Sequence, residues 1–178
     1  CFNLSEMGSM KTAPTLWAAD ILMNEGVIKK CVILSPLSTL ERVWLQEIFD
    51  VLMHRRAVIV HGGEEKRKKA LATDADFYII NHDGINIQEC FDAIRKRKDI
   101  GLVVVDEGSM FRNASTEKWK ALDRALAHHE RIWWLTGTPC PNAPTDAWAQ
   151  ARIVVPHRVP KFFGGFKRIT MQQWNQHK

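Results

Sequence analysis

The sequence predicts a three-layer α/β domain with a mostly parallel central sheet. Short apolar runs alternate with amphipathic segments of helix length along almost the whole chain. The runs are continuously apolar, which is typical of strands that are buried on both faces. Strands that alternate with helices in this way form parallel sheets with helices packed on both sides. Such sheets bind ligands at the carboxyl ends of their strands.

Length and composition indicate one compact intracellular domain. The chain has 178 residues, of which 46% are hydrophobic, and its formal net charge is +5. No run approaches the roughly 18 apolar residues that a membrane span requires, and the start lacks a signal-peptide pattern. The scattered cysteines form no C-x-x-C pair, so neither a zinc site nor a disulfide framework is predicted. We expect a soluble, cytoplasmic or nucleoid-associated protein, and the positive charge weakly favours a polyanionic partner.

The first loop, residues 4–12 with the sequence LSEMGSMKT, has the order of a phosphate-binding loop. It follows the apolar pair Cys1 and Phe2 and leads into a predicted helix over 12–24. Backbone N–H groups and a Lys-Thr pair at a helix start can hold phosphates and Mg²⁺. The pattern G-x-x-x-x-G-K-[ST] is incomplete, because Ser5 and Met10 replace its two glycines. Taken alone, the loop leaves nucleotide binding and an ordinary strand-to-helix turn equally open.

The other elements follow from the spacing of apolar residues. Continuous runs predict strands at 31–34, 57–60, 77–80, 102–106 and 132–136. Helical spacing predicts helices at 40–51, 83–98, 115–127 and 145–154. The basic segment 64–69 is interpreted as a solvated helix face. Ser115 is the predicted N-cap of its helix, and the chain beyond Pro156 is predicted to be irregular and basic.

Inward-facing positions can be assigned on the same basis. The predicted helix over 40–51 turns Leu40, Val43, Trp44, Ile48 and Val51 toward the core. Most of the tryptophans are predicted to be core residues instead of platforms for base stacking. They are Trp44, Trp119, Trp133, Trp134 and Trp148.

Two acids at the end of the predicted strand over 102–106 complete a nucleotide site. Asp106 ends this strand and Glu107 follows it. A carboxylate at that position beside a phosphate loop can hold Mg²⁺, and the next one can orient or deprotonate an attacking water. Two acids that simply begin a loop are the alternative. The combination with Lys11 and Thr12 favours the nucleotide site.

Five segments in register resemble motifs of superfamily-two helicases, and in detail those of Swi/Snf-type DNA translocases. EMGSMKT at 6–12 resembles motif I, VILSPLSTLERVWLQEI at 32–48 motif Ia, and IINHDGI at 79–85 motif Ib. DEGSMFRNASTEKWKAL from Asp106 resembles motif II with its following helix, and LTGTPCPNAPTDAW from Leu135 resembles motif III. The resemblance implies a RecA-like P-loop NTPase lobe over 1–155 with a basic extension over 156–178. It also implies a second RecA-like lobe of the same polypeptide as a partner.

The resemblance implies a role for each matching residue. ATP and Mg²⁺ would be the cofactors, with Gly8, Ser9 and Met10 lining the phosphate cradle. Lys11 would contact the outer phosphates, Thr12 and Asp106 would hold Mg²⁺, and Glu107 would activate water. Coupling between the nucleotide and DNA would fall to Thr136, Gly137 and Thr138. The backbone of DNA, expected to be double-stranded, would lie along Pro36, Leu37, Ser38, Asn81, His82, Arg112 and Asn113, for which helix caps or a solvated loop are the alternatives.

Departures from the motifs leave the activity open. Met10 occupies a glycine position, so the backbone there either avoids positive φ or is strained. Glycine and serine follow the acids, where the family has alanine and histidine. Because the arginine fingers of such motors lie on the second lobe, we expect this chain alone to be a poor ATPase. The alternatives are an ATP-sensing or DNA-binding module and a self-contained P-loop phosphotransferase. The compact form weakly favours a phage or bacterial origin.

Overall fold

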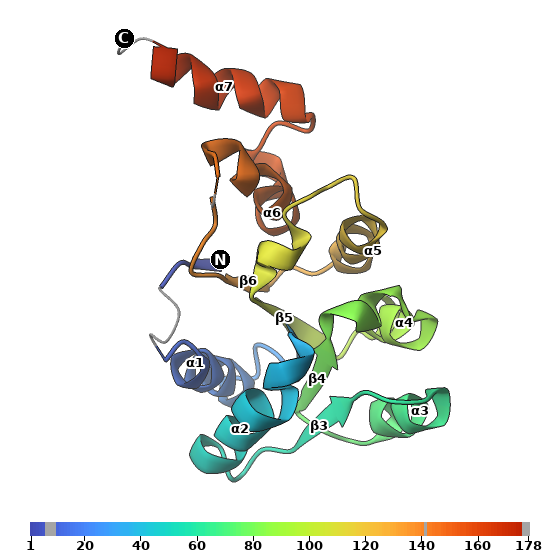
Figure 1. The fold of residues 1–178 in the computed structure, drawn as a ribbon. Helices are drawn as coiled ribbons and strands as arrows, with labels where there is room; N and C mark the ends of the chain where they lie inside the picture. Colours follow the sequence, from blue (N-terminus) through green and yellow to red (C-terminus); the bar gives the residue numbers. More distant parts are fainter. Residues whose placement is uncertain (6–9, 141, 176–178) are drawn as a thin grey trace.

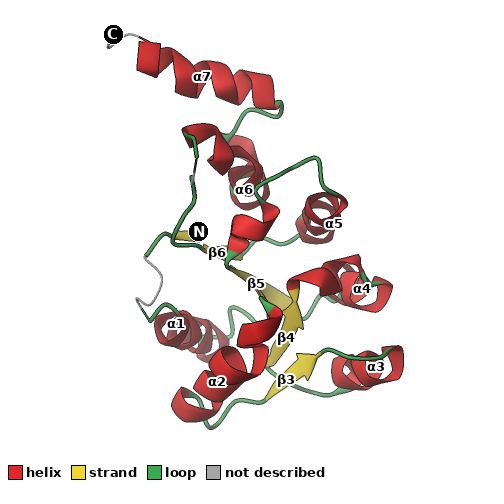
Figure 2. Cartoon of the chain, in the orientation of Figure 1, coloured by secondary structure: helices red, strands yellow, loops and turns green. Residues whose placement is uncertain are grey.

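The computed structural model contains one parallel β-sheet with helices on both faces (Figures 1 and 2). It describes residues 1–5, 10–140 and 142–175, without the side chains of 172–175. The sheet has six strands in the order β1-β6-β5-β2-β4-β3, and all the described pairings are parallel, which confirms the predicted fold class. The strands are β1 (Phe2–Asn3), β2 (Lys30–Ser35), β3 (Ala57–Val60), β4 (Phe77–Asn81), β5 (Ile100–Asp106) and β6 (Ile132–Leu135).

Helices pack on both sides of this sheet and create two hydrophobic clusters. Figure 1 shows α1 (Thr12–Asn24) and α2 (Gln46–Val51) on one face. The other face is covered by α3 (Glu64–Ala72), α4 (Gln88–Lys96) and α5 (Glu117–Leu126), with α6 (Ala147–Val154) beside β6.

The central strand β2 shows why the strands are continuously apolar. Cys31 and Ile33 belong to the cluster under α1 and α2, whereas Val32 and Leu34 belong to the cluster on the opposite face. Successive side chains of a strand point to opposite faces, so each face needs its own apolar set. Every position of β2 from Cys31 to Leu34 is fully buried.

The predicted helix over 40–51 is irregular at its start. A short 3₁₀ turn at Leu37–Thr39 leads into a π-helical turn at Leu40–Leu45, and α2 follows. Leu40, Trp44 and Ile48 are buried as predicted, but Val43 is 37% exposed. The prediction for Val43 was wrong because the wider π turn buries residues four apart and rotates the intervening position outward.

The N-cap of α5 also differs from the prediction. Thr116, and not Ser115, caps the helix, since its side chain accepts a hydrogen bond from the Trp119 backbone N–H at 3.2 Å. The Ser115 hydroxyl instead donates to Asn113 Oδ1 at 2.7 Å. Because the Ser115 hydroxyl is hydrogen-bonded to Asn113, it does not cap the helix, and the helix starts one residue later.

The segment beyond Pro156 is helical, which corrects the prediction of an irregular tail. A 3₁₀ turn at Pro156–Arg158 is followed by α7 (Phe163–Asn175), which projects from the body in Figure 1. Its first turn is attached to α6, because the Phe163 ring meets that of Trp148 edge to face at 5.5 Å. The sequence pattern did not predict this helix because Gly164 and Gly165 have a low helix propensity. No helix in the described part of the chain is long and apolar enough to cross a membrane.

The tryptophan prediction is confirmed for the strongest cases. Trp44 and Trp134 are fully buried. Trp119 and Trp133 are partly buried against the two hydrophobic clusters. Trp148 is half-buried, and its indole N–H donates to the Pro160 carbonyl at 2.9 Å.

Candidate active site

The strand order gathers the predicted site at one edge of the sheet. β6 lies between β1 and β5, and Leu135 at the end of β6 pairs with Asn3 on one side and with Asp106 on the other. Since the three strands are parallel, the loops that follow them leave the same edge. The phosphate loop, the turn at 106–108 after β5 (called the acidic turn below) and the loop after β6 are therefore neighbours.

The described end of the phosphate loop is suited to binding an anion. Lys11 directly precedes α1, and its Nζ donates to the Ser5 carbonyl at 2.9 Å across the loop. No described side chain caps the first turn of α1, which holds no acidic residue, so its backbone N–H groups and dipole favour a negatively charged ligand. Thr12 is the first residue of α1 and is half-buried. The predicted cradle residues Gly8 and Ser9 lie outside the described residues.

Met10 adopts the strained alternative of the two that the sequence left open. Its φ is +55°, in the left-handed region that favours glycine. Its side chain is 78% exposed, so little of it packs on the rest of the described chain. The loop thus follows a backbone path suited to glycine while carrying a long side chain.

The acidic turn is held by one hydrogen bond from another element and by one within the turn itself. Asp106 Oδ2 accepts a hydrogen bond from Trp44 Nε1 at 3.0 Å, and Oδ1 accepts one from the Glu107 backbone N–H at 3.0 Å. Burial raises the pKa of Asp106, while the Trp44 hydrogen bond and the positive charge of Lys11 act in the opposite direction. A bound cation would add to that opposing effect and favour the charged carboxylate.

Glu107 presents an exposed carboxylate from a left-handed backbone, with φ at +48°. The next residue, Gly108, is buried, and a Cβ built there would overlap the indole of Trp134. The turn can therefore approach Trp134 closely only because residue 108 has no side chain.

Trp44 contacts the acidic turn, although the apolar spacing predicted it only as a core residue. Its indole N–H must find a partner when buried, and the partner is the Asp106 carboxylate, 62 positions away in the chain. The π-helical turn at Leu40–Leu45 carries Trp44 to this position. Single-turn π segments occur often at functional sites, but the apolar spacing of this helix gave no sign of one.

Asn81 and His82, predicted to face DNA, lie in the interior. They are 8% and 4% exposed, and His82 Nε2 lies 2.8 Å from the Asp106 carbonyl oxygen. The His82 ring also meets Phe111 edge to face at 5.2 Å. Burial lowers the pKa of His82, which favours the neutral ring. His82 therefore connects the end of β4 to the end of β5, and both residues offer little surface to a phosphate backbone.

Apart from Thr136, the other predicted DNA and coupling residues are partly or fully on the surface. Leu37 is 57% exposed, Ser38 is exposed and Pro36 is half-buried at the end of β2. In the loop after β6, Thr136 is buried and its Oγ1 accepts from the Thr138 backbone N–H at 3.3 Å. Gly137 is half-buried, and Thr138 is exposed.

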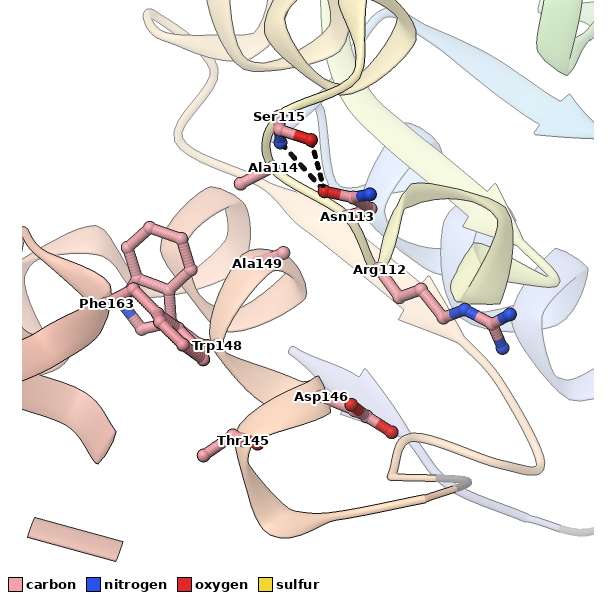
Figure 3. A pocket seen from close by; sticks show the side chains of 9 residues that line it. All are labelled: Arg112, Asn113, Ala114, Ser115, Thr145, Asp146, Trp148, Ala149 and Phe163. Carbon is pink, nitrogen blue, oxygen red and sulfur yellow. Dashed lines mark hydrogen bonds between the residues drawn. The ribbon is translucent and has the colours of Figure 1, made fainter. Parts of the chain in front are cut away.

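Arg112 and Asn113 line a cavity of about 430 Å³ between the segment 112–115 and α6 (Figure 3). Asn113 Oδ1 accepts hydrogen bonds from the backbone N–H and the hydroxyl of Ser115, at 3.0 and 2.7 Å. Figure 3 shows the guanidinium of Arg112 directed away from Trp148 and Phe163, which form the opposite wall. Arg112 is exposed and thus accessible to a polyanion.

Known proteins resemble this chain over most of its length. A protein of the Acyrthosiphon pisum secondary endosymbiont phage 1, described as putative protein p41, is 31% identical over 96% of this chain and 40% of its own. The human lymphoid-specific helicase is 24% identical over 85% of this chain and 18% of its own. The Sulfolobus solfataricus SWI2/SNF2 ATPase core, solved in complex with dsDNA, has a TM-score of 0.81 at 23% identity, covering 94% of this chain and 33% of that one.

The comparisons identify the family of this chain and show how much of each relative it covers. This chain spans less than half the length of each of the three proteins. The archaeal structure, because of its low identity, supports the fold alone. Residues 4–168, by contrast, match the SNF2-related domain. The resemblance inferred from the sequence motifs is thus confirmed: the chain belongs to the SNF2-related domain family.

Proposed function

We propose that this chain is the first motor lobe of an ATP-dependent DNA translocase, which binds ATP with Mg²⁺ and contacts the DNA backbone. The observation that carries the proposal is the order β1-β6-β5. It brings the Lys-Thr pair, the acidic turn and the Thr-Gly-Thr loop to one edge of the sheet. Hydrolysis would require a second lobe of the same polypeptide, since the charge on a transferring phosphoryl group needs stabilisation from a second side.

The donor set fits a nucleotide and one magnesium ion. Lys11 would neutralise the outer phosphates, and the Thr12 hydroxyl with the Asp106 carboxylate would hold the metal. No cluster of three or more potential metal-binding side chains occurs in the described part of the chain, and Mg²⁺ bound to a nucleotide typically needs only one or two from the protein. When bound, the ion would offset charge on the phosphates. Glu107 has an exposed carboxylate that can accept the proton of an attacking water.

Contact with the DNA backbone is supported by charge and exposure. The net charge is +5, and the exposed residues Leu37, Ser38, Arg112 and Asn113 follow two strands of the sheet. The archaeal neighbour was solved with dsDNA, which agrees with a duplex partner. Asn81 and His82 would contribute by fixing strand ends, given their burial. The phage relative supports the expectation of a phage or bacterial origin.

An ATPase assay on the full-length protein tests the proposal. We expect duplex DNA to raise the rate of ATP hydrolysis and Lys11→Ala to abolish it. Lys66→Ala is the matched control, because Lys66 is an exposed residue of α3. A rate that DNA does not change would contradict the translocase. In that case the strained Met10 would favour an ATP-sensing or DNA-binding module, whereas phosphoryl transfer to a small acceptor would indicate a phosphotransferase.

A further inference from the structure

A buried glutamine connects α6 to the loop after β6. Gln150 is 1% exposed, and its Oε1 accepts a hydrogen bond from Trp134 Nε1 at 2.8 Å. Its Nε2 donates to the Pro139 carbonyl at 3.2 Å. An indole N–H can only donate and a carbonyl can only accept, so these two partners determine which way the amide is oriented. Burying a primary amide is unfavourable unless it is paired, and here both of its ends are paired.

The Trp134 side chain reaches from this glutamine to the acidic turn. Trp134 is fully buried, and a Cβ at Gly108 would overlap its indole ring. The Phe111 ring, at the end of the 3₁₀ turn Gly108–Phe111, meets Trp134 edge to face at 6.0 Å. One continuous set of contacts therefore leads from the turn after Asp106, through Trp134 and Gln150, to Pro139 at the end of the Thr-Gly-Thr loop.

We propose that Gln150 is a positioning residue that holds the loop of residues 136–139 in place relative to the acidic turn. This inference rests on the proposed ATPase, because the loop would couple nucleotide turnover to DNA. The hydrogen bond to Pro139 fixes the far end of the loop. Its near end is fixed by β6, where Leu135 pairs with Asp106. Without Gln150 the far end loses its attachment to α6, while the sheet itself stays intact.

Two substitutions separate positioning from a role in packing alone. Gln150→Met keeps the length of the side chain and removes both hydrogen bonds. Trp119→Phe removes the hydrogen bond from Trp119 Nε1 to the Ala149 carbonyl of α6 but leaves Gln150 Nε2 free to hold Pro139. Both variants lose stability, since each leaves a buried polar group without its partner. Only Gln150→Met releases the loop.

The first measurement is steady-state ATP hydrolysis by the full-length protein with duplex DNA, below the unfolding temperature of each variant. For Gln150→Met we expect DNA-stimulated kcat to fall about tenfold with KM for ATP within about twofold of wild type, as loss of alignment produces. For Trp119→Phe we expect kcat within about twofold of wild type. Full activity in Gln150→Met, or equal losses in the two variants, would overturn the proposal. If Gln150→Met does not fold, Gln150→Leu serves instead, because its shorter apolar side chain also removes both hydrogen bonds.

The second measurement does not depend on activity. Hydrogen exchange followed by mass spectrometry reports the opening of the backbone around residues 136–140. We expect this segment to exchange faster in Gln150→Met than in wild type and to be unchanged in Trp119→Phe. Unchanged exchange in Gln150→Met would reject the positioning role. A wild-type protein without ATPase activity would instead reject the proposed function, and the exchange experiment would still decide the role of Gln150.

Discussion

The phosphate loop and the acidic turn share one backbone feature but differ in what holds them. Each has a non-glycine residue in the left-handed region, Met10 at φ +55° and Glu107 at φ +48°. In the acidic turn, Asp106 accepts a hydrogen bond from Trp44, and Gly108 is buried against Trp134. In the described part of the phosphate loop, Met10 is 78% exposed.

This difference shows where each strained backbone obtains its support. A non-glycine residue in the left-handed region costs about 1–2 kcal/mol, and such residues persist where the surroundings determine the conformation. The protein interior supplies that support to the acidic turn. We expect phosphate oxygens of the nucleotide to supply it to the phosphate loop, so the turn is preformed and the loop is completed by its ligand.

The largest effect is expected from Glu107→Gln in the full-length protein. The amide keeps the size of the side chain but cannot accept a proton from water, so DNA-stimulated turnover should fall about 10²- to 10⁴-fold. A preformed turn should hold glutamine in the same conformation, and the free energy of unfolding should change by less than about 0.5 kcal/mol. Glu117→Gln, at an exposed position of α5, is the control. A large loss of stability would show that the carboxylate itself supports the turn.

The packing of the acidic turn is tested by Gly108→Ala. The added methyl group would overlap Trp134, so we expect the free energy of unfolding in urea to fall by about 1–3 kcal/mol. Trp134→Leu makes room, and the double variant should be more stable than the sum of the two changes predicts. Gly63→Ala is the control, because a Cβ there meets nothing within 4 Å. Additive losses would mean that the turn and Trp134 are not coupled.

The sheet and the position of the site could be predicted from sequence because they follow from local patterns. Continuous apolar runs identified the strands, and parallel strands necessarily gather their following loops at one edge. Neither rule requires knowledge of which side chains meet. The polar residues after β1, β5 and β6 could thus be assigned to one site before the structure was known.

The supporting contacts could not be predicted, since they join residues far apart in the chain. The hydrogen bond from Trp44 to Asp106 spans 62 positions, and apolar spacing identifies Trp44 only as a core residue. The burial of His82 depends on Phe111, which packs against it from another segment. Residue type alone suggests a phosphate donor for His82, whereas its packing makes it a connection between strands.

The phosphate loop is tested by Met10→Gly. Glycine removes the strain at positive φ, about 1 kcal/mol, but makes the unfolded chain more flexible, so the stability without ligand should change little. ATP affinity or turnover of the full-length protein should rise about threefold to tenfold if the strain opposes closure on the phosphates. Met10→Ala is the control, because it removes the long side chain and keeps the strain. Equal gains in both variants would assign the effect to the side chain, and no gain in either would show that the loop is already adapted to methionine.

The smallest effect concerns the anchoring of α1, the helix that follows the phosphate loop. Asp20 has a side chain only 14% exposed and accepts hydrogen bonds from Arg55 Nε at 2.7 Å and His54 Nε2 at 2.9 Å. Burial alone would raise the pKa of Asp20, but these two partners together outweigh it and hold the pKa below its usual value. A carboxyl whose pKa is lower in the folded state contributes stability above its unfolded pKa, near 3.8, and that stability is lost as the pH falls through the folded pKa.

Asp20→Asn should therefore lower the free energy of unfolding by no more than about 1 kcal/mol at neutral pH, and the difference from wild type should disappear in acid. Urea denaturation between pH 7 and about pH 2 measures it, because the range must extend below the lowered pKa of Asp20. Asp74→Asn is the control, since the Asp74 side chain is 88% exposed and its ion pair with Lys30 should contribute little. A difference that persists at low pH would mean that Asp20 acts by shape and not by charge. If α1 proves firmly anchored and Met10→Gly still raises ATP affinity, the effect of residue 10 is confined to the phosphate loop itself.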